Sequence, residues 1–113
     1  MATDMATCCW RAEVLAGRGA DPFRRDETLM KAASPIEFVS RGLPDTLLVV
    51  GENDFPMLQA DARAFARKAE SLGGHVQVAL APGKDHMGVA RGMTDAHDFV
   101  LTTVQAFLQR EKL

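Results

Sequence analysis

Two different spacings of apolar residues organise the middle of the chain. The uninterrupted apolar run Leu47-Leu48-Val49-Val50, closed by Gly51, predicts a strand that is buried on both faces. From His75 to Ala81 the residues alternate, with Val76, Val78 and Leu80 set against His75, Gln77 and Ala79. This alternation predicts a second strand.

Two longer segments have helical spacing. Between Pro56 and the stop signal Gly73-Gly74, apolar residues recur every three or four positions, namely Leu58, Ala62, Phe65, Ala66, Ala69 and Leu72. A last helix, capped by Thr94 or Asp95, carries an apolar stripe of Phe99, Val100, Thr103, Val104, Phe107 and Leu108. The order strand, helix, strand, helix implies a parallel pair of strands joined by a right-handed crossover.

The first 33 residues have a weaker pattern. One short helix can end at Gly17, and a second can be capped by Asp26 and ended by Ser34-Pro35, because the residue before proline disfavours the α conformation. We therefore expect an irregular N-terminal segment with short helices over residues 1–33, followed by an α/β unit over residues 34–113.

Composition and charge exclude several classes of protein. The 113 residues suffice for one domain, and 13 basic against 15 acidic side chains give a net charge of −2 with no basic stripe. We expect no nucleic-acid partner. The longest apolar run is far below the roughly 20 residues that a membrane span needs, and the N-terminus has no signal-peptide pattern. We expect no membrane span and a cytoplasmic location.

Motifs for metals and cofactors are absent from the sequence. Cys8 and Cys9 are adjacent, which favours two reduced thiols over a disulfide, and a reactive or metal-binding pair would need further ligands. A metal site from Asp85, His86, Asp95, His97 and Asp98 is conceivable, but no typical ligand spacing supports it. Gly83-Lys84 lacks the remainder of a phosphate-binding loop. We expect neither a metal nor a cofactor.

An acid and a base stand out at the ends of the two strands. Asp54 follows the first strand and His86 follows the second, and in open α/β sheets this edge carries the chemistry. Histidine can accept and return a proton near neutral pH, while an acid holds its ring in one tautomer. Asp85 competes as the acid, whereas Asp45 lies before the strand. Read singly, Asp54 could be only a turn former and His86 only a loop histidine.

The ordered set Ser34-Pro35, Leu47 to Asp54, an amphipathic helix and Gly83-Lys84-Asp85-His86 resembles the C-terminal part of an α/β-hydrolase, closest to the esterase/lipase and arylformamidase-like branches. The resemblance covers about residues 34 to 110. It implies a partial hydrolase-type parallel sheet with two flanking helices. It also implies that Asp54 and His86 are the acid and the histidine of a Ser-His-acid triad.

The chain departs from that family in lacking a nucleophile. No Gly-x-Ser-x-Gly elbow occurs, and none of Ser34, Ser40 and Ser71 follows a strand and opens a helix. We therefore expect the C-terminal portion of a serine hydrolase acting on carboxylic esters or related amides, nearly inactive in isolation. The alternative is a truncated or non-catalytic α/β interaction module. A Rossmann-type binding domain is disfavoured because no phosphate-cradling loop is present.

A sheet of only two predicted strands has consequences for association. Its outer edges expose unpaired backbone N–H and C=O groups, which favour pairing with another chain. We expect self-association through such an edge.

Overall fold

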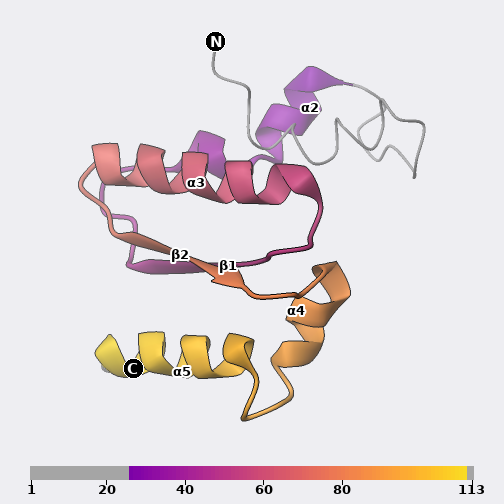
Figure 1. Ribbon diagram of the computed structural model, residues 1–113. Coiled ribbons are helices and arrows are strands. Elements are labelled where there is room, and N and C mark those ends of the chain that lie inside the picture. The colour runs from indigo at the N-terminus through magenta and orange to yellow at the C-terminus, as the bar shows by residue number, and fades with distance from the viewer. Residues whose placement is uncertain (1–25, 112–113) are drawn as a thin grey trace.

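The computed structural model describes residues 26–111, in which helices flank a two-stranded sheet (Figure 1). The elements are α2 (Glu27–Ala32), the 3-10 helix η1 (Pro35–Phe38), β1 (Thr46–Gly51), α3 (Pro56–Ser71), β2 (Val76–Ala81), α4 (His86–Gly92) and α5 (Phe99–Arg110). The predicted α/β class and the order of strands and long helices are confirmed. The predicted helix ending at Gly17 and the Cys8-Cys9 pair lie outside the described residues.

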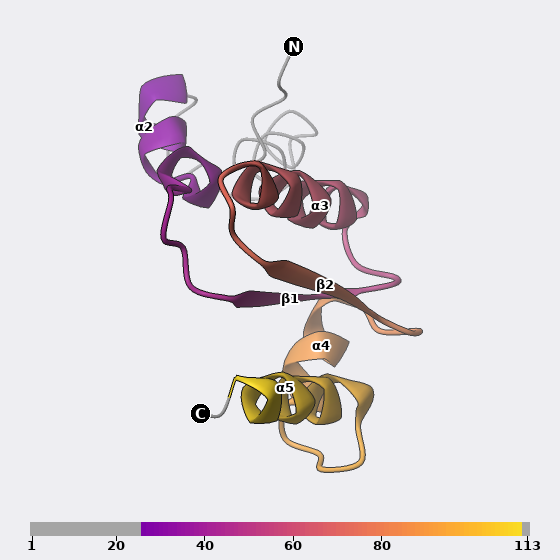
Figure 2. The same cartoon turned by 90° about the vertical axis from the view of Figure 1, so that its left-hand side faces the viewer.

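The two strands are parallel, as predicted, with Thr46 opposite Val76 and Gly51 opposite Ala81. A parallel pair needs a crossover, and α3 supplies it. Helix α3 covers one face of the sheet and α5 covers the other (Figure 2). The carboxyl ends of both strands therefore lie at the same edge, where the chain leaves for α3 and for α4.

Small side chains bring the helices close to the sheet. Ala62, Ala66 and Ala69 of α3 are buried, as are Ala79 and Ala81 of β2. In β1, Val50 is buried but Leu47, Leu48 and Val49 are only half-buried. The expected complete burial of β1 was wrong, because within residues 26–111 the sheet has no third strand on its outer side.

The short N-terminal elements follow the predicted signals. Asp26 caps α2, since its Oδ1 accepts hydrogen bonds from the backbone N–H of Thr28 at 2.9 Å and of Leu29 at 3.3 Å. Helix α2 ends before Ser34, and η1 begins at Pro35. The Lys68 ammonium donates to the Ile36 carbonyl at 2.7 Å, which fastens η1 to α3.

The start of the last helix differs from the prediction. Helix α5 begins at Phe99, and its cap is Asp98, whose Oδ1 accepts from the Val100 N–H at 2.9 Å. Thr94 instead donates its hydroxyl to the Arg91 carbonyl, and Asp95 accepts from the His97 N–H in a turn. His97 therefore precedes the helix. Several residues here can cap a helix, and sequence alone does not rank them.

The segment around His86 is also helical rather than the loop that we predicted. Helix α4 begins at His86, and Asp85 caps it by accepting from the Gly88 N–H at 2.6 Å. No helix within residues 26–111 is long and apolar enough to cross a membrane.

Candidate active site

The two side chains predicted to act together, Asp54 and His86, meet at the carboxyl edge of the sheet. Nδ1 of His86 lies 3.1 Å from Oδ1 and 3.3 Å from Oδ2 of Asp54. The residues are 32 positions apart in the chain, and the parallel register of β1 and β2 brings them together. The structure thus forms the acid–imidazole contact expected from the sequence.

Backbone hydrogen bonds hold the two loops in this arrangement. The N–H of Asn53 donates to the Lys84 carbonyl at 2.9 Å, and the N–H of Glu52 donates to the Ala81 carbonyl at 2.9 Å. Gly51 permits this close approach, because a Cβ at its position would lie 2.3 Å from the Lys84 carbonyl oxygen. The separation between acid and imidazole is therefore set by main chain rather than by flexible side chains.

The environment of Asp54 suits an orienting acid. Its side chain is only 5% exposed, and Oδ1 also accepts from the Phe55 N–H at 2.7 Å. A carboxylate offers acceptors only, so a neutral His86 ring must carry its proton on Nδ1 to bond with it. This leaves the lone pair of Nε2 available as a base.

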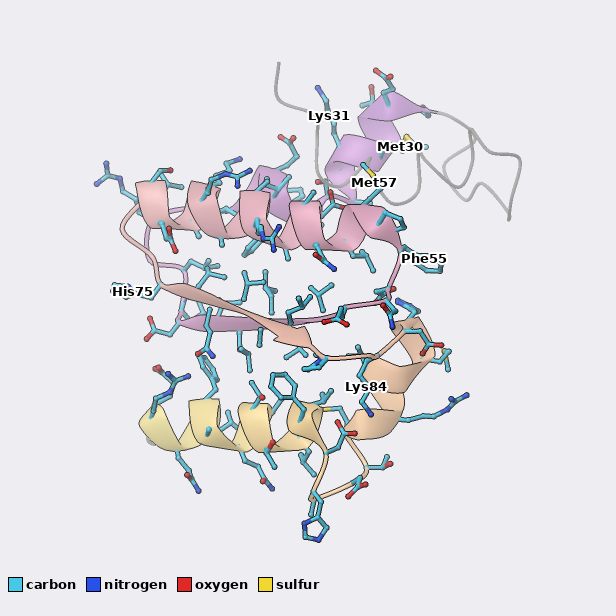
Figure 3. The ribbon with its side chains drawn as sticks, in the orientation of Figure 1. Met30, Lys31, Phe55, Met57, His75 and Lys84 are labelled. Carbon is cyan, nitrogen blue, oxygen red and sulfur yellow. The ribbon has the colours of Figure 1, made fainter. Side chains whose placement is uncertain are left out.

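His86 has the opposite environment, since its side chain is 61% exposed. Its ring centroid lies 5.2 Å from that of Phe55, with 36° between the planes. Phe55 lies at the carboxyl end of the sheet and His75 at the other end (Figure 3). Phe55 was not predicted from the sequence, although its position directly after the acid was the available signal.

A shallow cavity of about 280 Å³ surrounds the pair, lined by Asn53, Asp54, Phe55, Pro56, Asp85, His86 and Met87. Apolar groups from Phe55, Pro56 and Met87 lie beside the imidazole. The cavity can therefore accept a small, partly apolar group next to Nε2.

An ion pair that was also not predicted from the sequence holds the loop between β2 and His86 against the start of α5. Nζ of Lys84 bonds to Oδ2 of Asp98 at the start of α5, and the two side chains are 29% and 13% exposed. Figure 3 shows Lys84 on the α4 side of the strands. The hydrogen bond from Lys84, followed by that from the Val100 N–H, lowers the pKa of Asp98 below its usual range.

This lowered pKa predicts a specific loss of stability in acid. An acid whose pKa is lower in the folded than in the unfolded state stabilises the fold above its unfolded pKa, and this contribution disappears as the pH falls through the folded value. Between about pH 5 and pH 2, Asp98→Asn should therefore lose less free energy of unfolding than the wild type. Urea unfolding across this range measures the difference.

The matched variant Lys84→Met keeps the carboxylate and removes the side chain that lowers its pKa most. The free energy of unfolding of Lys84→Met should therefore depend on pH almost as weakly as that of Asp98→Asn. Identical acid profiles for all three proteins would contradict a role of the pair in stability.

The competing candidates lie elsewhere or have other partners. Asp45 and His75 line a separate cavity at the opposite end of the sheet, where burial and a hydrogen bond with Asp45 raise the pKa of Glu111. Asp85 is engaged as the cap of α4. Within residues 26–111 no cluster of three His, Cys, Asp or Glu side chains could hold a metal ion.

None of the three serines reaches the histidine. Ser34 is fully buried, and its hydroxyl has no hydrogen-bond partner among the described residues. The Ser71 hydroxyl donates to the Lys68 carbonyl at the end of α3, and Ser40 lies in the exposed connector before β1. His86 lines the cavity of about 280 Å³ and also a second cavity of about 710 Å³, and none of the three serines lines either of them.

Comparisons of this chain with protein-family models, with curated proteins and with solved structures found no match. A role for Asp54 and His86 is therefore argued from their geometry.

Proposed function

We propose that this chain is the C-terminal portion of a serine hydrolase acting on carboxylic esters or related amides, and that it supplies the acid and the histidine of the site. One observation carries the proposal. The buried carboxylate of Asp54 contacts Nδ1 of His86, whose side chain is largely exposed. A general base needs this combination of a fixed tautomer and free access.

The chemistry assigned to the pair is proton transfer. Nε2 of His86 takes the proton from an attacking hydroxyl, and Asp54 stabilises the imidazolium that forms. The imidazolium then returns the proton to the leaving alcohol or amine. In this proposal the nucleophile and the oxyanion donors come from outside residues 26–111, because none of the described serines lies beside His86.

The size of the surrounding cavity bears on the substrate. The cavity of about 280 Å³ bounded by Phe55, Pro56 and Met87 shares Asp54, His86 and Met87 with a second cavity of about 710 Å³. Most residues that line the second cavity are apolar, which suits an apolar acyl group.

Hydrolysis of p-nitrophenyl acetate by the full chain tests the catalytic role. An accessible imidazole can itself accept the acyl group on Nε2, release p-nitrophenolate and then lose the acyl group to water. We expect a weak rate above buffer that falls more in His86→Ala than in variants of the other histidines, because Asp54 fixes the Nδ1–H tautomer of His86 alone. His97→Ala is the matched control, because His97 is also exposed but lies in the turn before α5.

A loss of rate in His97→Ala as large as that in His86→Ala would contradict the proposal, because it would show that the contact with Asp54 gives His86 no advantage over another exposed histidine. The alternative function, a non-catalytic interaction module, is favoured by a different feature: within residues 26–111 no strand other than β2 pairs with β1.

A further inference from the structure

Helix α4, which carries His86, is too short to keep its position by itself. It has seven residues, and an isolated helix of this length is unstable in water. Contacts with β1 and α5 therefore hold it in place, and Figure 1 shows α4 between the end of β2 and the start of α5. His86 is the first residue of the helix, so the direction of its ring depends on these contacts.

The ion pair of Lys84 and Asp98 lies against both ends of α4. At the first end, Lys84 directly precedes the cap of the helix, and a Cβ added at Gly88 would lie 3.4 Å from Cδ of Lys84. At the last end, Asp98 lies so close to Gly92 that an added Cβ would overlap its Oδ1. The carboxylate of Asp98 thus contacts the end of α4 directly and the start of α4 through Lys84.

Lys84 also connects this pair to the loop of the acid. Its carbonyl accepts a hydrogen bond at 2.9 Å from the N–H of Asn53, the residue before Asp54. Its ammonium bonds to Oδ2 of Asp98, while Oδ1 of Asp98 caps α5 through the Val100 N–H at 2.9 Å. The acid loop, α4 and the start of α5 therefore meet at one lysine.

The pair is suited to a lasting structural contact. The two side chains are 29% and 13% exposed, so salt screens their attraction less than it screens a pair in open solvent. The hydrogen bond from Lys84 is the main cause that lowers the pKa of Asp98. The carboxylate therefore stays charged at the neutral and alkaline pH at which an imidazole acts as a base.

We propose that Lys84 and Asp98 are positioning residues for His86, because their ion pair holds both ends of α4 and so directs Nδ1 of His86 at Asp54. Neither residue lines the two cavities that His86 lines, so both act through α4 rather than on a substrate. The inference rests on the proposed function, since the direction of the ring matters for chemistry only if Nε2 serves as the base.

Long-range ¹H–¹⁵N correlation spectra of the full chain in alkaline solution test the inference. Lys84→Met and Asp98→Asn should each shift the neutral His86 ring from Nδ1–H toward the tautomer balance of a histidine with no acid beside Nδ1. Asparagine also caps helices well, so Asp98→Asn removes the charge and keeps the cap of α5. It keeps the test decisive if Lys84→Met fails to fold. Lys84→Arg retains the charge and should retain the wild-type tautomer.

Lys68→Met is the matched control, because it also removes an ammonium that joins two elements. The Lys68 ammonium donates to the Ile36 carbonyl at 2.7 Å and connects η1 with α3, which covers the face of the sheet opposite α5. Lys68→Met should lower the free energy of unfolding and leave the His86 tautomer unchanged.

Three outcomes separate this inference from the proposed function. A wild-type ring on Nδ1–H that neither Lys84→Met nor Asp98→Asn changes would overturn the inference and leave the proposed function standing. A shift in Lys68→Met as large as that in Lys84→Met would also overturn the inference, because general loosening of the fold would then explain both. A wild-type ring protonated on Nε2 would overturn the proposed function, and the inference with it.

Discussion

Gly51→Ala is expected to lower the free energy of unfolding by about 3 kcal/mol or more, the upper end of the cost of overpacking a close contact. The added Cβ would lie 2.3 Å from the Lys84 carbonyl oxygen and 3.1 Å from Cγ2 of Val89. The nearer atom belongs to the backbone, so no rotamer change can relieve the clash. Either the end of β1 or the loop of residues 82–85 before His86 must move.

The same movement should separate Asp54 from His86. It would break the hydrogen bond from the Asn53 N–H to the Lys84 carbonyl, which holds the loops of these two residues together. Urea unfolding measures the loss of stability, and the NMR signals of the His86 ring report the change at the site.

Gly42→Ala is the control for the loss of a glycine. Gly42 has a φ of +86°, and a Cβ added there would meet nothing within 4 Å, so only backbone strain of about 1–2 kcal/mol is expected. A Gly51→Ala protein no less stable than Gly42→Ala would show that the close approach to Lys84 is not as the structure has it.

Asp54→Asn is expected to shift the tautomer balance of the neutral His86 ring from Nδ1–H toward Nε2–H. In the wild type both carboxylate oxygens are acceptors, so Nδ1 carries the proton. In the wild type, Oδ1 of Asp54 accepts a hydrogen bond from the Phe55 N–H at 2.7 Å, and in the variant the amide oxygen would accept this bond. The amide NH₂ group, at the Oδ2 position 3.3 Å from Nδ1, would then compete for that nitrogen with the amide oxygen 3.1 Å away, which shifts the ring proton toward Nε2.

Long-range ¹H–¹⁵N correlation spectra in alkaline solution distinguish the two tautomers. With Nε2 protonated the base is lost, and in a complete Ser-His-Asp site the corresponding change lowers kcat by about 10⁴. The His86-dependent part of the weak ester hydrolysis should fall as the population of the Nδ1–H tautomer falls.

Asp85→Asn is the matched control, because it alters the neighbouring carboxylate, which bonds to the Gly88 N–H. Asparagine also caps helices well, so α4 and the His86 tautomer should be unchanged. A wild-type ring protonated on Nε2, or a tautomer unaffected by Asp54→Asn, would remove the basis of the proposed function.

The elements that sequence predicted well are those with strong local patterns. The run Leu47 to Val50 predicted β1, and the spacing of Leu58, Ala62 and Phe65 predicted α3. These patterns determine which face of an element is apolar, and burial of that face stabilises it in nearly any packing. The meeting of Asp54 and His86 followed, since parallel strands end at one edge.

The elements that sequence missed are those whose stability depends on distant partners. Helix α4 has only seven residues, too few for an isolated helix, and its apolar residues Met87 and Val89 give little periodicity. The start of α5 was misplaced because Thr94, Asp95 and Asp98 are all competent caps. Lys84 selects Asp98 by bonding to its second carboxylate oxygen, a contact between residues 14 positions apart.

The sequence by itself therefore determined the α/β class, the strand and helix order, and the acid and histidine of the candidate site, because each depends on local spacing or on one rule of sheet topology. Only the tertiary structure decided which cap starts α5, that Phe55 lies against His86, and that one cavity extends along β1 to Asp54 and His86. These features arise from contacts between segments far apart in the chain, whose geometry local propensities do not encode.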